Sequence, residues 1–538
     1  MASLAPEELA IVDRCIARIA KGRAVAAACV YGSKAAGYAR PDSDIDLLVV
    51  LDDYRYKVKY AYVKESGVHV SALVVDKGAL EKDASRGYLG EFVAGRLLHV
   101  YRPVVNAAFL EGVERACKRR IILEELHELV KTSGVLATEI SFPLEYVLFS
   151  KVKRRAALYP AAAYSYYRTY ADGRNLRAAL AGYKDALADI VSKDGELFET
   201  SGGEIRISEK RIGVAKGEPA LRLAQRMHEF SSYFIHSYAG RHMFHMAVVE
   251  AEAKIRRHMR QPVEFPPFMA CPACEYLSLP EGLLISDSKR QDWLDMVAKS
   301  HGVSRYSVSR RRLGNANSRT VLYALDGLKL AVKDMSKSKA VKWAALSVWT
   351  APVKKFRVGP LLRLGYEYRA LRHLRKLGLA TPAVEAVVLD RKVLVLQFVE
   401  GRNVAGIIRD SLASRDADLA PLRKAGEQMA RVHEAGHAFG NIKPKNVIIG
   451  DRLYFTDLDQ FAFEGGDPAW DVAEFVSWGL KESMNDKAAA AIAKEFLSGY
   501  GNAGVIKKVA NSRRYIEAFY PVLVPAVAQA IKKEMKKF

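Results

Sequence analysis

Three short apolar runs near the start of the chain restrict what it can fold into. They are AVAAACVY (24–31), IDLLVVL (45–51) and VHVSALVV (68–75). Runs of this length suit buried strands and are too short for buried helices. An amphipathic stretch at 6–21, with apolar residues three and four positions apart, precedes them and predicts a helix. The sequence therefore predicts a small α/β domain over residues 1–105.

The loop between the first two predicted strands carries a phosphate-binding pattern. Gly32 and Ser33 directly follow the first strand, where glycine allows the backbone to turn and to approach a phosphate closely. Backbone N–H groups at such a turn, together with the Ser33 hydroxyl, can hold the oxygens of a triphosphate. Lys34 and Arg40 lie in the same loop, and we expect them to meet the phosphates as positive charges.

Two carboxylates open the second predicted strand. Asp44 and Asp46 are two positions apart, so on a strand both side chains point to the same face. Neighbouring carboxylates repel each other unless a cation lies between them, and hard oxygen ligands of this kind suit Mg²⁺. Metal ions held there can polarise the attacking hydroxyl and the leaving pyrophosphate. We expect metal binding and catalysis at this pair; the alternative is that it merely begins a strand.

Residues 1–105 resemble the polymerase-β-like nucleotidyltransferases, in particular the small minimal nucleotidyltransferase type. The resemblance rests on the Gly-Ser turn after a strand, the short loop, and the Ser-Asp-Ile-Asp that opens an apolar strand. It implies transfer of a nucleotidyl group from ATP or another NTP to an acceptor hydroxyl. The family usually places a third carboxylate on the following strand, where this chain has His69 and Ser71. The missing carboxylate is expected to affect the catalytic step more than the binding of the nucleotide.

The middle of the chain has a different character. Residues 106–260 are predicted to be mainly helical, with two short strands around a Gly-Gly turn at 195–208 that could belong to a winged-helix-like module. The proline-rich composition of residues 261–300 predicts a linker. Within it, Cys271 and Cys274 have the spacing of half a zinc site, but the other cysteines supply no second pair. A loop with two thiols is the expectation.

Residues 301–538 carry a second set of motifs in a fixed order. A predicted strand contains Lys333, and the following predicted helix has Glu367 near its start. A lysine on a strand can pair the α- and β-phosphates of ATP, and a glutamate on the next helix can fix that lysine. Asn446 and Asp457 follow at the spacing that holds Mg²⁺. We therefore expect a second nucleotide site in this part of the chain.

This run resembles the two-lobed protein-kinase-like fold, especially the compact archaeal kinases of the RIO and KEOPS-associated types. The resemblance implies that Gln397 and Val399, where a strand leads into a turn, bind the nucleotide, and that Lys443 faces its phosphates. GDPAWDVAEF is similar to a motif of aminoglycoside phosphotransferases, which implies that Asp471 is a buried buttress under the catalytic loop. That loop has Asn441 where the family has its proton-accepting aspartate. Losing a general base typically costs on the order of 10²–10⁴ in rate.

The net charge of +22 is unevenly distributed along the chain. Residues 301–538 carry +17 of it, and residues 301–376 hold 18 Lys and Arg against 3 Asp and Glu. So dense a basic cluster suits a polyanion, and we expect RNA as a partner through 301–376. A well-solvated surface is the alternative. The oligomeric state is unknown from the sequence.

The remaining composition sets broad limits. No apolar run reaches the roughly 18 to 20 residues that span a bilayer, so we expect no membrane partner and a cytoplasmic location. Five cysteines in this length do not suggest a disulfide framework. The scarcity of glutamine, seven in the chain, fits a thermophilic, archaeal source.

The sequence as a whole predicts an α/β and α+β multidomain protein. A nucleotidyltransferase α/β domain is followed by a helical middle and a protein-kinase-like bilobal domain. The first functional hypothesis is nucleotidyl transfer with Mg²⁺ at Asp44 and Asp46. The second is a phosphotransferase acting through Lys333 and Asp457 on a protein or a small molecule. The third is a non-catalytic RNA- or ribosome-associated nucleotide sensor.

Overall fold

A computed structural model describes residues 5–41, 43–158, 160–194, 198–201, 203–210, 273–313, 320–336, 356–413 and 417–538. The chain divides into two compact units. Unit 1 comprises Met1–Thr132 and Ile140–Ser278, and unit 2 comprises Ser133–Glu139 and Leu279–Phe538. The predicted α/β and α+β multidomain class is confirmed, whereas the finer division at residues 105, 260 and 300 stays a prediction.

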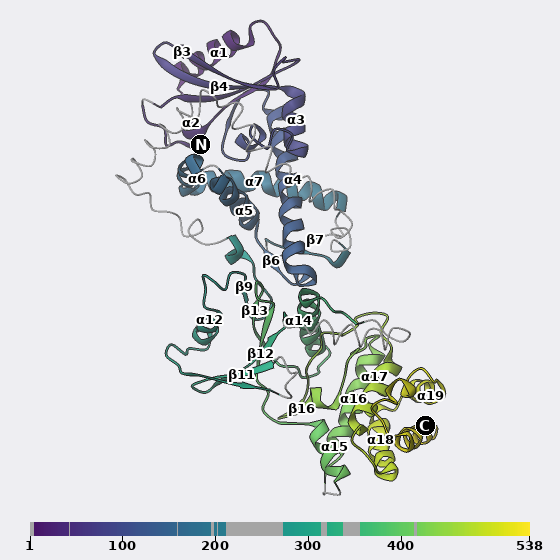
Figure 1. Ribbon diagram of the computed structural model, residues 1–538. Helices are drawn as coiled ribbons and strands as arrows, with labels where there is room; N and C mark the ends of the chain where they lie inside the picture. The colour runs from purple at the N-terminus through teal and green to yellow at the C-terminus, as the bar shows by residue number, and fades with distance from the viewer. Residues whose placement is uncertain are drawn as a thin grey trace. The chain divides into compact units, whose positions relative to one another are not determined.

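Unit 1 begins with a five-stranded sheet in the order β3-β4-β2-β1-β5. Figure 1 labels β3 and β4 of this sheet beside α1 (Pro6–Ala20). The strands are β1 Val25–Tyr31, β2 Ile45–Leu51, β3 Val58–Glu65, β4 Val68–Asp76 and β5 Arg102–Val105. β2 and β4 run parallel, and the other neighbouring strands are antiparallel. The three strands predicted from apolar runs are confirmed as β1, β2 and β4. β3 escaped prediction because its residues alternate between half-buried and exposed positions instead of forming an apolar run.

The two faces of this sheet meet different parts of the chain. Helix α1 packs Val12 and Ile16 against Leu47 and its neighbours on one face, which forms a closed apolar core. The opposite face carries Tyr60, whose ring meets that of Phe92 edge-on at 6.1 Å between centroids. The segment after α3 (Lys77–Arg86) therefore covers the second face.

A buried carboxylate ties the helical middle of unit 1 to this segment. Glu91 is 2% exposed and accepts hydrogen bonds from Arg120 of α4 (Ala107–Ser133) at 2.7 Å and from Lys151 at 2.6 Å. Lys151 and Arg155 lie on α5 (Leu144–Leu158), and Arg155 reaches the second oxygen of Glu91 at 3.3 Å. Removing one member of such a network leaves a buried charge without its partner, which typically lowers the free energy of unfolding by about 3–5 kcal/mol.

The rest of the middle is helical, as predicted, with a small sheet. Its further elements are α6 Pro160–Ala171, α7 Gly173–Asp194, β6 Ser141–Phe142, β7 Phe198–Ser201 and β8 Glu204–Ile207. β7 and β8 form the hairpin predicted within 195–208, and the sheet order is β6-β8-β7. The winged-helix-like interpretation stays a prediction. Cys271 lies outside the described residues, as do residues 314–319 and 337–355 of the basic segment.

Unit 2 opens with a six-stranded sheet in the order β10-β11-β12-β14-β13-β9. The strands are β9 Leu283–Ile285, β10 Val308–Arg312, β11 Thr320–Leu325, β12 Leu328–Asp334, β13 Val384–Val388 and β14 Val393–Gln397. Residues 279–300, which lie within the stretch predicted to be a linker, carry β9 and a helix, α12 (Trp293–Ser300). β9 pairs in parallel with β13, and α12 buries Leu294 and Val297 on the sheet.

Helix α14 (Pro360–Lys376) lies against this sheet and is backed by a segment from much earlier in the chain. Residues Gly134–Thr138 form a short 3₁₀ helix, η2, that packs on α14. At Gly365 a Cβ atom would lie 2.8 Å from the backbone nitrogen of Leu136, so the two backbones touch. Glu139 forms ion pairs with Arg372 and, at 3.6 Å, with Arg369 of the helix.

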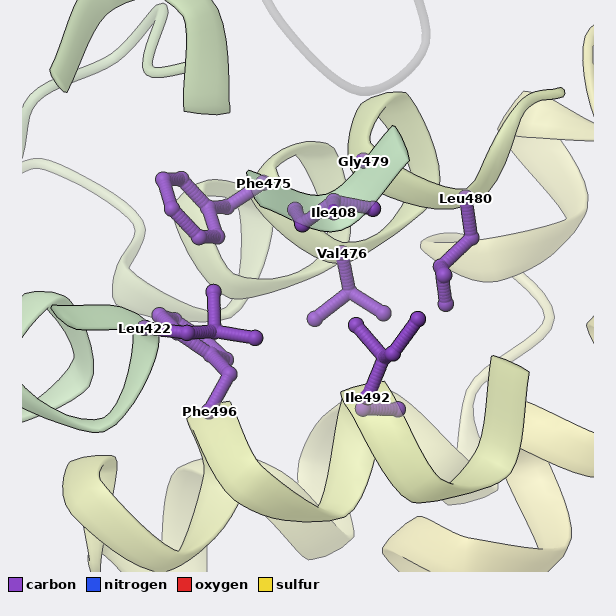
Figure 2. A pocket seen from close by; sticks show the side chains of 9 residues that line it. Ile408, Leu422, Phe475, Val476, Gly479, Leu480, Ile492 and Phe496 are labelled. Atoms are coloured by element: carbon purple, nitrogen blue, oxygen red, sulfur yellow. The ribbon is translucent and has the colours of Figure 1, made fainter. Parts of the chain in front are cut away.

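The second half of unit 2 is helical around an apolar interior. Its elements are α15 Val404–Leu412, α16 Ala420–Glu434, α17 Pro468–Leu480, α18 Asp486–Tyr500, α19 Ala503–Asn511, α20 Pro525–Met535, β15 Arg402–Asn403, β16 Val447–Ile449 and β17 Leu453–Phe455. Figure 2 shows Ile408, Leu422, Phe475 and Ile492 converging from four helices. The cavity between them is about 10 Å³, which is too small for a ligand. These helices are packed interior rather than a binding site.

In the described part of the chain, no helix combines the length and the apolar character needed to cross a bilayer.

Close helix packing in unit 2 depends on glycine. A Cβ atom at Gly426 of α16 would overlap the backbone of α18 at Phe496 and Tyr500. We expect Gly426→Ala to lower the free energy of unfolding of unit 2 by about 1–3 kcal/mol, the usual cost of overpacking. Gly504→Ala, at an exposed helix position with ordinary contacts, is the matched control and should be neutral or slightly stabilising. Urea unfolding followed by tryptophan fluorescence measures both; equal stabilities would contradict the packing argument.

Candidate functional site

The first candidate site lies where β1 ends and β2 begins. The antiparallel register places Tyr31, the last residue of β1, opposite Asp46. Gly32, with φ 74°, starts the short helix α2 (Gly32–Ala36), which takes the place of the expected loop. A Cβ atom at position 32 would overlap the Asp46 carboxylate. Only glycine therefore allows the turn and the carboxylate to approach this closely.

Asp46 stands in a row of side chains that crosses four strands. The register pairs Tyr62 of β3 with Ser71 of β4, Ser71 with Asp46, and Asp46 with Tyr31. Paired residues of neighbouring strands share a face, so this row lies on one side of the sheet. Ser71 occupies the place beside Asp46 where a third carboxylate would face the metal, and it offers a hydroxyl instead of a charge. Asp44 is exposed just before β2.

An arginine near Asp46 was not identified from the sequence. Arg96 ends the short 3₁₀ helix Ala94–Arg96, and its guanidinium lies 5.4 Å from the ring centroid of Tyr31. Burial disfavours its charged form, but the field of Tyr31 and, among other groups, of Asp46 outweighs this and raises the pKa of Arg96. The side chain is therefore a fixed positive charge near the first site. Its only signal in the sequence is a lone arginine inside an apolar run.

The loop cations expected at the phosphates have other neighbours here. Lys34 forms an ion pair with Glu8 of α1 at 2.8 Å, which lowers the pKa of the Glu8 carboxyl. A phosphate would have to compete with that partner. Arg40 is exposed, and its backbone N–H donates to the Ser43 hydroxyl at 2.9 Å. Ser33 is half-buried within α2.

Helices of the middle hold the turn in place. The Tyr38 hydroxyl donates to the backbone oxygen of Ser165 on α6 at 3.2 Å, and Asn175 of α7 donates to the Ala36 oxygen at 2.9 Å. The Arg168 guanidinium lies 5.6 Å from the centroid of the Tyr38 ring. α6 therefore adds a second arginine to the vicinity of the Gly-Ser turn.

The second candidate site is built around Lys333 of β12. Its ammonium donates to Glu367 of α14 at 2.5 Å and also forms an ion pair with Asp457. Asn446 donates to the other Asp457 oxygen at 3.3 Å. Burial disfavours the ammonium, but the two carboxylates outweigh burial and raise the pKa of Lys333. The structure thus brings together the four residues that the motif order predicted, although they are up to 124 residues apart.

The two carboxylates that hold Lys333 respond to burial differently. Burial is the largest single influence on Asp457 and raises its pKa, but the attraction and hydrogen bond of Lys333, together with the charges of two further lysines, outweigh burial and lower the pKa overall. Burial of Glu367 outweighs the attraction of Lys333, and its pKa rises to about 7. Near neutral pH, Asp457 is therefore ionised while Glu367 is partly protonated.

A third carboxylate, missed in the sequence, joins this group. Oxygens of Glu367, Asp457 and Asp459 lie within 4.8 Å of one another. Arg363, one turn before Glu367 on α14, donates to Asp459 at 2.6 Å. Glu367 and Asp459 each keep one buried oxygen without a hydrogen-bond partner among the described residues. Such oxygens fit a hard cation such as Mg²⁺. In the sequence, the signal that could have revealed Asp459 is the second acid of TDLDQF, two positions after Asp457.

The loop before Asn446 is fixed from below by a buried aspartate. Asp471 of α17 accepts the backbone N–H groups of Phe439 and Gly440 at 2.6 and 2.7 Å, and its side chain also lies 3.1 Å from His433. This agrees with the buttress role that the resemblance implied. Asn441, which follows directly, is half-buried.

Lys443 points toward α17 in this structure. Its ammonium lies 3.7 Å from a Glu474 oxygen and 4.6 Å from the centroid of the Trp478 ring. Lys445 also acts on Asp457 by its charge, less strongly than Lys443 does. The pKa of Lys445 is lowered first by burial and then by Lys443, against the attraction of Asp457. Phosphate contact by Lys443 stays a prediction.

Gln397 and Val399, the residues predicted to bind the nucleotide, lie at the end of a strand and just after it. Gln397 is the last residue of β14 and pairs with Leu330 of β12, three positions from Lys333. Its backbone N–H donates to Ala383 at 2.9 Å, and its side chain is exposed. Val399 follows in the connection to β15 and is half-buried. Their contact with a nucleotide stays a prediction.

Comparison with known proteins supports both resemblances. The family described as "Nucleotidyltransferase domain" matches residues 13–89, so the chain carries such a domain near its N-terminus. Over 135 residues the chain is 26% identical to the KEOPS complex subunit Bud32 of Pyrococcus abyssi, covering 25% of this chain and 60% of that protein. Over 169 residues it is 28% identical to a probable bifunctional tRNA threonylcarbamoyladenosine biosynthesis protein of Methanosphaera stadtmanae, covering 29% and 30%.

These likenesses are partial. The chain spans less than two thirds of the length of either relative, 60% and 30%. Among solved structures, the choline kinase LicA from Streptococcus pneumoniae aligns with 46% of this chain and 100% of its own, at 12% identity and a TM-score of 0.21. A nucleotidyltransferase domain and a likeness to Bud32-type kinases are therefore shown.

The Gly32 turn can be tested against a control with the same backbone strain. Gly32 and Gly22 have φ values of 74° and 79°, but a Cβ atom at position 22 would meet nothing within 4 Å. We expect alanine at either position to cost about 1–2 kcal/mol of stability. Only Gly32→Ala should displace the Asp46 carboxylate and abolish photo-labelling of unit 1 by 8-azido-ATP with Mg²⁺. Labelled peptides from before residue 133 report on unit 1; unchanged labelling there would contradict the role of the turn.

The raised pKa of Glu367 predicts how the stability of unit 2 depends on pH. The folded chain holds this proton more tightly than the unfolded chain, whose glutamates have a pKa near 4.5. The resulting stability is fully present below about pH 4.5 and is lost as the pH rises through about 7. Glu367→Gln cannot ionise, so we expect it to remove this loss, at most about 3 kcal/mol.

Urea unfolding in EDTA at several pH values measures this effect. The fluorescence reports on unit 2, because all five tryptophans follow residue 292: Trp293, Trp343, Trp349, Trp470 and Trp478. Glu400→Gln, an exposed acid of the same unit, should keep the wild-type pH profile. A Glu367→Gln profile parallel to that of the wild type would show that Glu367 titrates normally.

Proposed function

We propose that unit 1 transfers a nucleotidyl group from an NTP to an acceptor hydroxyl, with Mg²⁺ held by Asp44 and Asp46. The observation that carries this proposal is the close approach of the Gly32 turn to the Asp46 carboxylate, which leaves no room for a side chain. With the turn and the carboxylate this close, a Mg²⁺ ion held by the carboxylate would act on phosphates bound at the turn. The nucleotidyltransferase family match over residues 13–89 supports the same reading.

The residues around the turn have distinct tasks in this proposal. Asp44 and Asp46 supply hard oxygen ligands, and Mg²⁺ bound there would stabilise charge on the phosphates and lower the pKa of the acceptor hydroxyl. The Gly32 and Ser33 backbone bind the triphosphate. Arg96 supplies a fixed positive charge near Asp46.

Unit 2, in our proposal, binds ATP and Mg²⁺ through Lys333, Asn446 and Asp457. The preformed contacts of Lys333 with Glu367 and Asp457 support this second function, because they place the ammonium beside a metal ligand. Phosphoryl transfer to a protein or a small molecule is the candidate reaction. Asn441 stands in the loop without a carboxylate to accept a proton, so we expect this reaction to be slow and unit 2 to serve mainly as a nucleotide sensor.

RNA is the proposed partner of the basic segment. β10 is an edge strand whose Arg310, Arg311 and Arg312 are all exposed. The Arg310 guanidinium lies 4.9 Å from the centroid of the Tyr323 ring, which with Trp293 lines a cavity of about 410 Å³. Arginine beside aromatic rings is suited to phosphates and bases. The tRNA-related name of one relative agrees with this proposal, as it does with a cytoplasmic location; an archaeal source stays a prediction.

Two labels of ATP distinguish the reactions. The full chain, with Mg²⁺, is given ATP labelled at the α- or the γ-phosphate, with total RNA and protein extract as acceptors. We expect label from the α-position, and a loss on the order of 10³-fold in Asp46→Asn, because the metal contributes several kcal/mol. Asp13→Asn, an exposed acid of α1, is the matched control and should keep the activity.

The other outcomes are equally informative. Transfer only of the γ-label, lost in Lys333→Met, would overturn the proposal and make unit 2 the enzyme. ATP binding without transfer of either label would favour the sensor. Loss of α-transfer in Asp13→Asn as well as Asp46→Asn would point to misfolding of the variants.

A further inference from the structure

We propose that Tyr62 and Tyr60 of β3 form a stacking platform for the bases of a single-stranded RNA acceptor, next to Asp46. The inference rests on the proposed nucleotidyl transfer and names the class of its acceptor. It follows from the register of the sheet together with the exposure and charge of β3.

Exposed aromatic side chains gather around β3. Tyr56, Tyr62 and Tyr88 are 51%, 58% and 42% exposed, and they are three of the eight exposed large hydrophobic side chains in the described part of the chain. A folded domain gains free energy by burying such rings. Tyr56 lies beside Tyr54 on the α1 side of the sheet, so Tyr62 is the exposed ring that indicates a binding surface on the Asp46 face.

Two of the tyrosines present parallel rings. Tyr60 and Tyr62 lie two positions apart on one face of β3, with ring centroids 6.1 Å apart and planes within 10° of each other. The Tyr60 ring is held edge-on by Phe92, and the Tyr62 ring is exposed. Flat, parallel, partly exposed rings are the geometry on which nucleic-acid bases stack, without regard to sequence.

The platform lies at a useful distance from the metal-binding carboxylate. Tyr62 pairs with Ser71, and Ser71 pairs with Asp46, so Tyr62 and Asp46 are two strand spacings apart on the same face. Two spacings are about 10 Å. A nucleotide whose base stacks on Tyr62 can therefore bring its terminal sugar hydroxyl to Asp46, which is what nucleotidyl transfer to an RNA end requires.

The charge around the platform favours RNA. The Lys57 ammonium lies 4.9 Å from the ring centroid of Tyr88, and the exposed Lys64 lies on the same face of β3 as the platform. On β3 the single acid is Glu65, which is already paired with Arg14 at 2.9 Å. Lysines beside aromatic rings attract a phosphate backbone. The same lysines repel the β3 edge of a second copy, so we favour RNA over self-association.

Photo-cross-linking tests the platform at its own location, separately from RNA bound by unit 2. The full chain is irradiated with a 4-thiouridine-labelled RNA 10-mer without NTP, and the linked peptides are identified. We expect a linked peptide containing residues 55–65, reduced about 5- to 100-fold in Tyr62→Ala, the usual effect of one stacked base. Tyr62→Phe keeps the ring and should keep the link. Tyr520→Ala, an exposed tyrosine near Lys532, is the matched control and should not change it.

Several results would overturn the platform. These are no link at 55–65 in the wild type, an unchanged link in Tyr62→Ala, or sedimentation showing a dimer that Tyr62→Ala dissociates. The failure of the platform is distinguishable from failure of the proposed function. α-Label transferred to RNA with no link at 55–65 removes the platform alone. A Tyr62-dependent link with no transfer of α-label to any acceptor removes nucleotidyl transfer and leaves RNA binding.

Discussion

The buried Glu91 carboxylate is the constraint on which the arrangement of unit 1 depends. A carboxylate at 2% exposure is tolerable only if cations satisfy it, and Arg120, Lys151 and Arg155 do so from two helices. The neighbouring Asp83 accepts four backbone N–H groups between residues 89 and 94, at 2.7 to 3.2 Å. The segment fixed in this way carries Phe92 and Arg96 to the face of the sheet where Asp46 lies. The electrostatics of the first site are thus determined by a charge network away from the site itself.

The two candidate sites use opposite constructions. In unit 1 the essential groups lie within 15 residues, from Gly32 to Asp46, and a sharp turn brings them together. In unit 2 the groups around Lys333 come from separate elements and are held by ion pairs in a buried setting. A local motif survives much change elsewhere in the chain. A site assembled from distant elements is lost when any one of them moves, which makes unit 2 better suited to sensing a ligand.

What the sequence could predict follows this distinction. Gly32 and Asp46 were found because their chemistry depends on local spacing, and the motifs of unit 2 were found because their order along the chain is retained. Arg96 and Asp459 were missed because their roles arise from tertiary neighbours that spacing does not reveal. β3 was missed because an edge strand whose side chains are alternately exposed to solvent has no apolar run. The orientation of Lys443 toward Glu474 depends on α17, which places Glu474 31 residues further along the chain, and no local pattern could supply it.

The 3₁₀ segment η2 has a consequence for how the protein can be divided. Residues 133–139 belong to unit 2, yet the chain on both sides of them belongs to unit 1. Val135, Leu136 and Ala137 are buried, and Gly365 of α14 has no side chain because the Leu136 backbone lies against it. A fragment that starts at residue 279 would therefore expose the back of the helix that carries Glu367. A fragment that ends at 278 would carry three apolar residues with no face to cover them. Neither part of the chain is a complete folding unit, so biosynthesis must reach unit 2 before the buried surface of η2 can form.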